Sequence, residues 1–181
     1  EDIDFNSITA AQVSSIPGKV MGDSVPAVAT LYKKRVSGIY TLFNSFSGVF
    51  DGNGKTISQL GVPLFQELSG TAQVFDLTLE GQIGSFDNRC VLSTAMGALA
   101  CTLPSGTVSI TNVTNRVDLI VKHVSYGVGG IVGEQTGGAL SISQCKNEGR
   151  VDCVNLWTTK TATVFAGGIL GRVTNDNSSV E

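Results

Sequence analysis

The sequence has few charged residues and no run of basic ones. Asp, Glu, Lys and Arg make up 15% of the chain, with 12 Lys plus Arg against 15 Asp plus Glu, which gives a net charge of −3. A nucleic-acid-binding surface is usually a strongly basic patch, so nothing here predicts a nucleic-acid partner. Low charge together with 22 glycines is typical of an all-β extracellular module.

Long apolar runs are also absent. No apolar stretch approaches the roughly 20 residues that a transmembrane helix needs, so we expect no membrane insertion by this segment. The sequence shows no signal peptide and begins at Glu1 rather than at a methionine. We interpret it as a mature or excised fragment.

Residue patterns for catalysis or metal binding are scarce. His123 is the only histidine and no Ser or Cys elbow motif accompanies it, so a catalytic triad has little support. The four cysteines form no Cys-x-x-Cys pair, so we expect no metal site. The acidic residues that a glycosidase would need show no recurring cluster on one face: Asp76, Glu80, Asp118, Glu134, Glu148 and Asp152. The sequence therefore predicts no enzyme, no cofactor and no metal.

The stretch from Asp51 to Thr56, DGNGKT, is similar to two ligand-binding loops but matches neither. The phosphate-loop pattern Gly-x-x-x-x-Gly-Lys-Thr has one residue fewer between its glycines than Gly48 and Gly54 have here. In an EF-hand loop that began at Asp51, Lys55 would occupy a ligand position. We interpret the stretch as a tight turn, in which Asp-Gly and Asn-Gly adopt positive φ and join residues 47–50 to residues 56–60.

An internal repeat is the strongest positive feature. Residues 70–77 align with residues 106–113 and with residues 138–145, at spacings of 36 and 32 residues. Three columns of the alignment are apolar: Val74, Ile110 and Ile142; Leu77, Val113 and Cys145; and Ile83, Leu119 and Val151. The column between the first two is polar and contains Asp76, Asn112 and Gln144. A fixed period of this size indicates a stacked repeat architecture.

The segments before these turns recur as well. We align Val62–Phe65, Gly97–Ala100, Gly130–Gly133 and Gly168–Gly171, and predict a short apolar strand at each. Such units cannot bury their apolar face alone, so they stack and bring the apolar columns into register. The predicted fold is a parallel β-solenoid, right-handed by analogy with other parallel crossovers.

Residues 1–45 do not follow the repeat. The one predicted helix is Ala10–Ile16, with Ser7 or Thr9 as its cap and Pro17-Gly18 at its end. We expect residues 1–45 to form an N-terminal cap with lead-in strands, which would protect an open sheet edge. Residues 46–181 would then form the β-solenoid repeats of a single structural domain.

The repeat carries a family resemblance. Gly130–Gly133 with Cys145–Val151, CKNEGRV, resembles the GLUG repeat, in which a glycine-apolar-apolar-glycine strand precedes a Cys-x-Asn-x-Gly-x-Val strand. Phe46–Ile57 resembles the segment that commonly leads into such repeats. The likeness covers about residues 46–171, although Gly97–Ala100 and Asn115–Val117 each lack one glycine of the pattern. The family occurs in secreted and surface-attached bacterial proteins, notably of gut Bacteroides-like organisms, and beside some IgA-specific metallopeptidases. The resemblance implies an extracellular or cell-surface location.

The cysteines are expected to be mainly structural. Cys145 falls in an apolar column and is predicted to be a small buried hydrophobe. Cys153 lies two residues after the inward Val151 and would face inward as well. A disulfide is an open alternative, with Cys90 and Cys101 as the favoured pair, since spacing alone does not decide it.

The predicted function is a non-catalytic surface module for adhesion or ligand presentation. Its partner would be a host extracellular protein, a glycan or neighbouring domains of the same chain. Two alternatives stay open, a carbohydrate-binding or carbohydrate-active β-helix domain and a spacer or accessory domain of a larger surface peptidase. Trp157, the only tryptophan, either stacks on a sugar ring or partner or packs as a local lid over its loop. Because the next inward strand would begin near Glu181, we also expect the natural protein to continue beyond that residue.

Overall fold

The computed structural model describes residues 3–4, 43–86, 90–91, 95–122, 126–154, 163 and 165–174. Over these residues every element is a β-strand and every strand pairing is parallel. The expected helix Ala10–Ile16 and most of the expected cap lie outside the described residues. In the part of the chain that the structure describes, no helix is long and apolar enough to cross a membrane.

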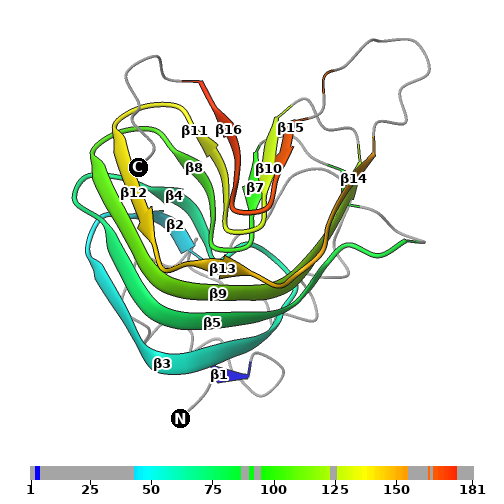
Figure 1. Ribbon diagram of the computed structural model, residues 1–181, viewed down its shortest axis with the longest axis horizontal. Coiled ribbons are helices and arrows are strands. Elements are labelled where there is room, and N and C mark those ends of the chain that lie inside the picture. The colour runs from blue at the N-terminus through cyan, green and yellow to red at the C-terminus, as the bar shows by residue number, and fades with distance from the viewer. Residues whose placement is uncertain are drawn as a thin grey trace.

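The strands form three parallel sheets (Figure 1). The largest has the order β1 (Ile3–Asp4), β3 (Val49–Leu60), β5 (Gln73–Ile83), β9 (Thr107–Lys122) and β12 (Ala139–Ser143), and β6 (Cys90–Val91), β13 (Lys146–Asn147) and β14 (Val151–Val154) also pair with β9. The second has the order β16 (Leu170–Val173), β11 (Val132–Gln135), β8 (Ala100–Leu103), β4 (Phe65–Leu68) and β2 (Phe43–Phe46). The third has the order β15 (Phe165–Gly167), β10 (Gly127–Gly129) and β7 (Met96–Gly97).

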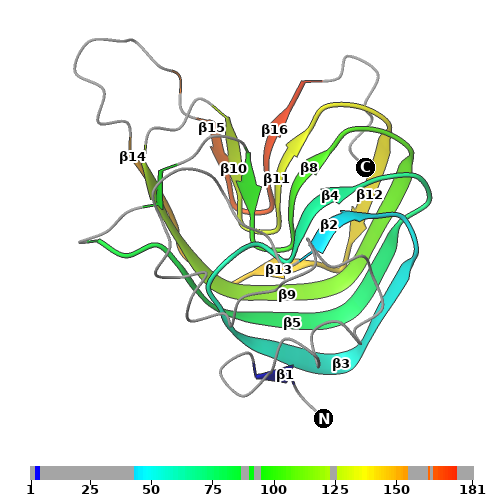
Figure 2. The same ribbon diagram turned by 180° about the vertical axis from the view of Figure 1, so that it is seen from behind.

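The chain visits these sheets in a recurring order and so builds layers. We number the layers 1 (residues 43–60), 2 (residues 65–83), 3 (residues 96–122), 4 (residues 127–154) and 5 (residues 165–173). Strands of one layer pair with the corresponding strands of the next. Figure 2, seen from behind, shows β3, β5 and β9 following the same bend. The sequence period is therefore the spacing between layers.

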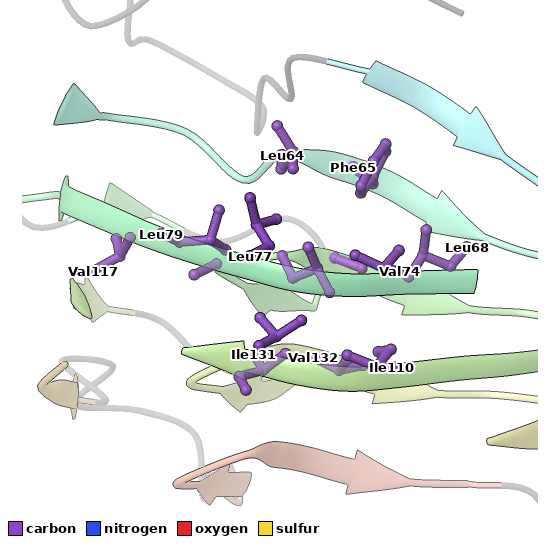
Figure 3. Packing of buried hydrophobic residues seen from close by; sticks show 14 of the residues in the cluster. Leu64, Phe65, Leu68, Val74, Leu77, Leu79, Ile110, Val117, Ile131 and Val132 are labelled. Atoms are coloured by element: carbon purple, nitrogen blue, oxygen red, sulfur yellow. The ribbon is translucent and has the colours of Figure 1, made fainter. Parts of the chain in front are cut away.

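The strand register confirms the three predicted apolar columns. β5 and β9 pair Val74 with Ile110, and β9 and β12 pair Ile110 with Ile142. Leu77 pairs with Val113, and Leu119 pairs with both Ile83 and Val151. Side chains of these columns in layers 2 and 3 are buried in the core that Figure 3 shows.

The predicted polar column marks the bend in the long strands. Asp76, Asn112 and Gln144 have φ of 54°, 51° and 54°, in the left-handed region. Asn and Asp tolerate this conformation better than most side chains because they hydrogen-bond locally. A left-handed residue at the same place in layers 2, 3 and 4 turns the chain in the same direction in each of them, which keeps these layers parallel.

The short apolar segments before the turns are corners rather than single strands, so that prediction is wrong. Residues 130–131 lie between β10 and β11, and residues 98–99 lie between β7 and β8. The predicted register between layers 3 and 4 is also wrong by one residue, because Ala100 pairs with Val132 and not with Gly133. The recurring feature is the crowded glycine before each of these two corners: a Cβ on Gly97 would lie 2.3 Å from the Ile131 carbonyl oxygen, and a Cβ on Gly129 would lie 2.0 Å from the Val132 carbonyl oxygen.

The stretch from Asp51 to Thr56 has the predicted positive φ at Asn-Gly but not at Asp51-Gly52, and it does not make the predicted connection. Asn53 and Gly54 have φ of 50° and 67°, as expected for a turn, and the Asp51 carboxylate accepts a hydrogen bond from the Asn53 N–H at 2.7 Å. Both flanks nevertheless belong to one strand, β3, whose register against β5 shifts between Asp51 and Lys55. The stretch is a bulge on the strand and does not reverse the chain.

The two ends of the stack differ in burial. In layer 1, Phe46, Phe50, Ile57 and Leu60 are all buried, and the Phe46 and Phe65 rings stack at 5.0 Å between centroids. Layer 4 still contributes buried core residues, but several apolar residues of layers 4 and 5 that pack against the core are only partly buried: Ile142, Cys145, Val151, Cys153, Ile169 and Leu170. The first described layer is therefore covered, whereas the last ones expose part of their apolar interior.

Candidate functional site

A ladder of charges crosses three layers on the exposed face of the largest sheet. Arg116 on β9 donates from Nη1 to Glu80 at 2.9 Å and from Nε to Glu148 at 2.7 Å, and Lys146 also pairs with Glu148. We call these four residues the charged ladder. Hydrogen bonds from Lys146 and Arg116 lower the pKa of Glu148 to about 2, and those from Glu148 and Glu80 raise the pKa of Arg116. Glu148 is therefore ionised at neutral pH.

A pair of asparagines lies inside the stack directly beside this ladder. Asn115 is fully buried, its Nδ2 donates to Asn147 Oδ1 at 2.7 Å, and its Oδ1 accepts from the Val117 N–H at 3.0 Å. Asn147 repeats the local bond by donating to the Gly149 carbonyl at 2.9 Å. The two amides occupy the same position in successive layers and satisfy backbone groups of Val117 and Gly149.

An apolar hollow opens beside β12, between layers 4 and 5. Its volume is about 280 Å³ and its lining is Leu140, Ile142, Gln144, Cys145, Ile169 and Leu170. Cys145 is part of this lining, and its thiol donates to the backbone carbonyls of Ser143 at 3.3 Å and Ile110 at 3.5 Å. Burial raises the pKa of this thiol, so it is mainly protonated at neutral pH.

The remaining acidic residues are engaged in separate contacts. Asp118 accepts from the Arg150 N–H at 2.8 Å, and Arg150 Nη2 pairs with Asp152 at 2.8 Å. Glu134 is buried, accepts from the Gly127 N–H at 3.4 Å and faces Arg172 at 3.7 Å. Among the residues that the structure describes, no group of three or more His, Cys, Asp or Glu side chains is placed to hold a metal ion.

The structure answers some of the residue predictions. Cys145 packs against the core in its predicted column but is only half-buried. Cys101 is buried and forms no disulfide, so the favoured pairing of Cys90 with Cys101 is wrong. Cys101 takes a core position in β8, and its neighbour in layer 4 is a glycine whose Cβ would lie 2.6 Å from the Cys101 carbonyl. Trp157 and His123 lie outside the described residues.

Sequence reasoning missed both the charged ladder and the asparagine pair. The signal was present, because Glu80, Arg116 and Glu148 are related by the same spacings of 36 and 32 residues as the apolar columns. Asn115 and Asn147 share the second spacing. Comparing polar residues along the period, as was done for apolar ones, would have found both sets.

Comparisons with protein-family models, with curated proteins and with solved structures find no match to this chain.

Proposed function

We propose that this chain is a non-catalytic module of a bacterial cell surface, a parallel β-solenoid of the GLUG-repeat type that serves adhesion or ligand presentation. The solenoid form is supported by the pairing of each layer with the next in parallel sheets. The GLUG assignment rests on the sequence pattern around Gly130 and Cys145, and the extracellular location rests on that assignment.

One observation carries the functional part of the proposal. On the exposed face, the acidic and basic side chains of the charged ladder bind each other across the layers. Carboxylates held in this way face arginine and lysine instead of an open cleft, so they suit a rigid repetitive surface better than general acid and base roles. A surface of this kind presents loops and strand faces to a partner without reorganising.

The test is to screen the purified chain against arrays of glycans and of host extracellular proteins. Saturable binding to an extracellular protein that weakens with Arg116→Ala would support adhesion through the ladder face. Arg116→Ala is a suitable probe because exposed ion pairs contribute only about 0–1 kcal/mol to stability. Glycan binding that is lost with Trp157→Ala would favour the carbohydrate-binding alternative, and the absence of binding on both arrays would favour the spacer.

A further inference from the structure

The hollow beside β12 lies where the next strand of the largest sheet would run. Layer 5 contributes β15 and β16 to the two smaller sheets. In the part of the chain that the structure describes, β12 and β13 pair with β9 on one side and with no strand on the other. Figure 1 shows them as the outermost pieces on β9. Among the described residues, layer 4 therefore offers an open strand edge, formed by β12 and β13, beside the apolar lining of the hollow.

The apolar lining repeats an arrangement that is covered one layer earlier. Ile131 and Val132 are fully buried in layer 4, and they pack in the same core as Leu140 of that layer. Their counterparts in layer 5 are Ile169 and Leu170, because Val132 pairs with Leu170. These two line the hollow and are only partly buried. What layer 5 lacks among the described residues is the counterpart of β12.

A glycine at the edge of this space points to the shape of the missing occupant. In layer 4, a Cβ on Gly130 would lie 2.1 Å from the Gly168 carbonyl oxygen of the next layer and 2.4 Å from Asn147 Cγ, so the next layer's backbone and the Asn147 side chain together require a glycine there. Gly168 is the next residue in this column, since Gly129 pairs with Gly167. A Cβ on Gly168 would meet no heavy atom within 4 Å among the described residues. Neither its φ nor its surroundings explain a glycine, whereas an asparagine docked opposite would.

The asparagine pair is oriented to continue in the same direction. Asn115 of layer 3 donates to Asn147 Oδ1 of layer 4. The hydrogen bond between the two asparagines therefore runs from amide nitrogen to amide oxygen in the direction of layer 5. Asn147 uses one amide hydrogen for the Gly149 carbonyl, and an amide carries two. An asparagine placed one layer further would accept the second hydrogen with its side-chain oxygen.

We propose that this edge docks an extended β-segment with the pattern of residues 139–154, in parallel with β12 and β13. The segment carries apolar side chains at the places of Leu140, Ile142 and Cys145, an asparagine at the place of Asn147 and a glycine at the place of Gly149. Its apolar side chains fill the hollow, its backbone pairs with the open edge, and its asparagine occupies the space opposite Gly168. This is strand addition with side-chain specificity.

The opposite end of a second copy does not fit this description. Layer 1 buries Phe46, Phe50 and Ile57, and β3 pairs with β1 on its outer edge at Ile57 and Ser58. A stack of copies, head to tail, would therefore bring together an open apolar edge and a covered one. The proposed occupant is instead a strand that carries the repeat pattern itself.

The experiment adds a synthetic peptide with the sequence of residues 138–154 to the full chain. The peptide carries Cys145→Val and Cys153→Val, so that Cys145 of the chain reports on the hollow, and it bears a fluorophore at its N-terminus. Binding is followed by fluorescence anisotropy, and alkylation of chain Cys145 by iodoacetamide is followed by mass spectrometry. We expect saturable binding and alkylation that slows about tenfold or more when the hollow is filled.

The glycine column gives the specific test. Gly168→Ala in the chain should weaken peptide binding about tenfold, because the new Cβ would occupy the place of the peptide asparagine. A peptide with Asn147→Ala should bind more weakly to the wild-type chain and lose little further affinity to Gly168→Ala. Gly48→Ala is the matched control, because its Cβ would make an ordinary 3.4 Å contact with Phe46 in layer 1, and binding should be unchanged.

Three results would overturn the proposal. The first is no saturable binding, and the second is equal affinity for wild-type chain and Gly168→Ala. The third is a Cys145 thiol that is already shielded without peptide. In that case, sedimentation velocity would identify what covers the hollow. A dimer would indicate a second copy of the chain, and a monomer would indicate the chain's own remaining residues.

Discussion

At the scale of single residues, polar side chains hold successive layers together from inside the core. Asn115 is the clearest example, because it is fully buried and bonds both its own backbone at Val117 and the next layer at Asn147. Replacing it by an apolar residue removes three hydrogen bonds at once. The buried backbone N–H of Val117 and the partly buried side-chain oxygen of Asn147 then lose these partners.

We therefore predict that Asn115→Ala lowers the free energy of unfolding by about 2–3 kcal/mol. Equilibrium unfolding in urea measures this change. Thr111→Ala is the control, because it removes one exposed hydrogen bond to Ser143 and should cost well under about 1 kcal/mol. Equal losses for the two variants would contradict the view that burial makes the asparagine important.

The charged ladder predicts a dependence of stability on acid. The folded-state pKa of Glu148 is lowered to about 2 by Lys146 and Arg116, below its ordinary value in an unfolded chain. A lowered folded-state pKa stabilises the fold above the unfolded-state pKa, and this contribution is lost as the pH falls through the folded-state value. The relevant window therefore runs from about pH 4.5 down to about pH 2.

Glu148→Gln should remove this part of the acid sensitivity. Urea midpoints measured between neutral pH and pH 2 should fall less steeply for Glu148→Gln than for the wild-type chain, and the two curves should converge in acid. Because these side chains are exposed, added salt should narrow the difference at neutral pH. Parallel curves over the whole range would show that the ladder does not set the Glu148 titration.

At the scale of elements, the bend in β9 depends on one left-handed residue. Asn112 has φ of 51°, and its amide donates to Asp76 in the preceding layer at 2.6 Å. A β-branched residue is a poor substitute because its side chain clashes in this region. We predict that Asn112→Val destabilises the chain by about 1–3 kcal/mol.

The neighbouring position gives a control for this prediction. Thr111 is already β-branched and lies in the same strand before the bend, so Thr111→Val should change stability by less than about 1 kcal/mol. Thermal unfolding of both variants measures the difference. A tolerated Asn112→Val would mean that the bend does not need a left-handed residue.

The elements also show which features a sequence can predict. The columns of Val74, Leu77 and Ile83 with their repeats were predictable because inward positions need apolar side chains in every layer, and their register is confirmed. The corner at residues 130–131 was not, because a corner and a strand share the same apolar and glycine residues. The one-residue register error at Ala100 has the same origin, since Gly129 and Gly130 are adjacent glycines and either could be aligned with Gly97, whereas the structure pairs Gly97 with Gly129.

The candidate site was less predictable than the fold. The charged ladder and the asparagine pair follow the period, but their columns change residue type between layers, with Glu80 opposite Arg116 and Leu79 opposite Asn115. An apolar-column search therefore passes over them. The hollow depends on which layer lacks a covering strand, which is a property of the assembled stack and not of any local motif.

At the scale of the whole molecule, position in the stack determines how much a side chain contributes. Ile110 and Ile142 are the same residue type in the same column, paired with each other across β9 and β12. Ile110 is fully buried in layer 3, whereas Ile142 is partly exposed at the hollow. Ile142 packs against the core, as the sequence predicts. Its burial is incomplete because no described strand covers β12.

This pair gives a direct measurement of the open end. Ile110→Ala should lower the free energy of unfolding by about 3 kcal/mol, because it removes buried apolar area and leaves a cavity, whereas Ile142→Ala should cost only about 1 kcal/mol. Chemical denaturation of both variants under one set of conditions provides the comparison. If the peptide of residues 138–154 covers the hollow, the contribution of Ile142 to stability should rise toward that of Ile110 when the peptide is saturating. Two equal losses without peptide would instead mean that layer 4 is already covered, and the open edge would then have no place in the folded protein.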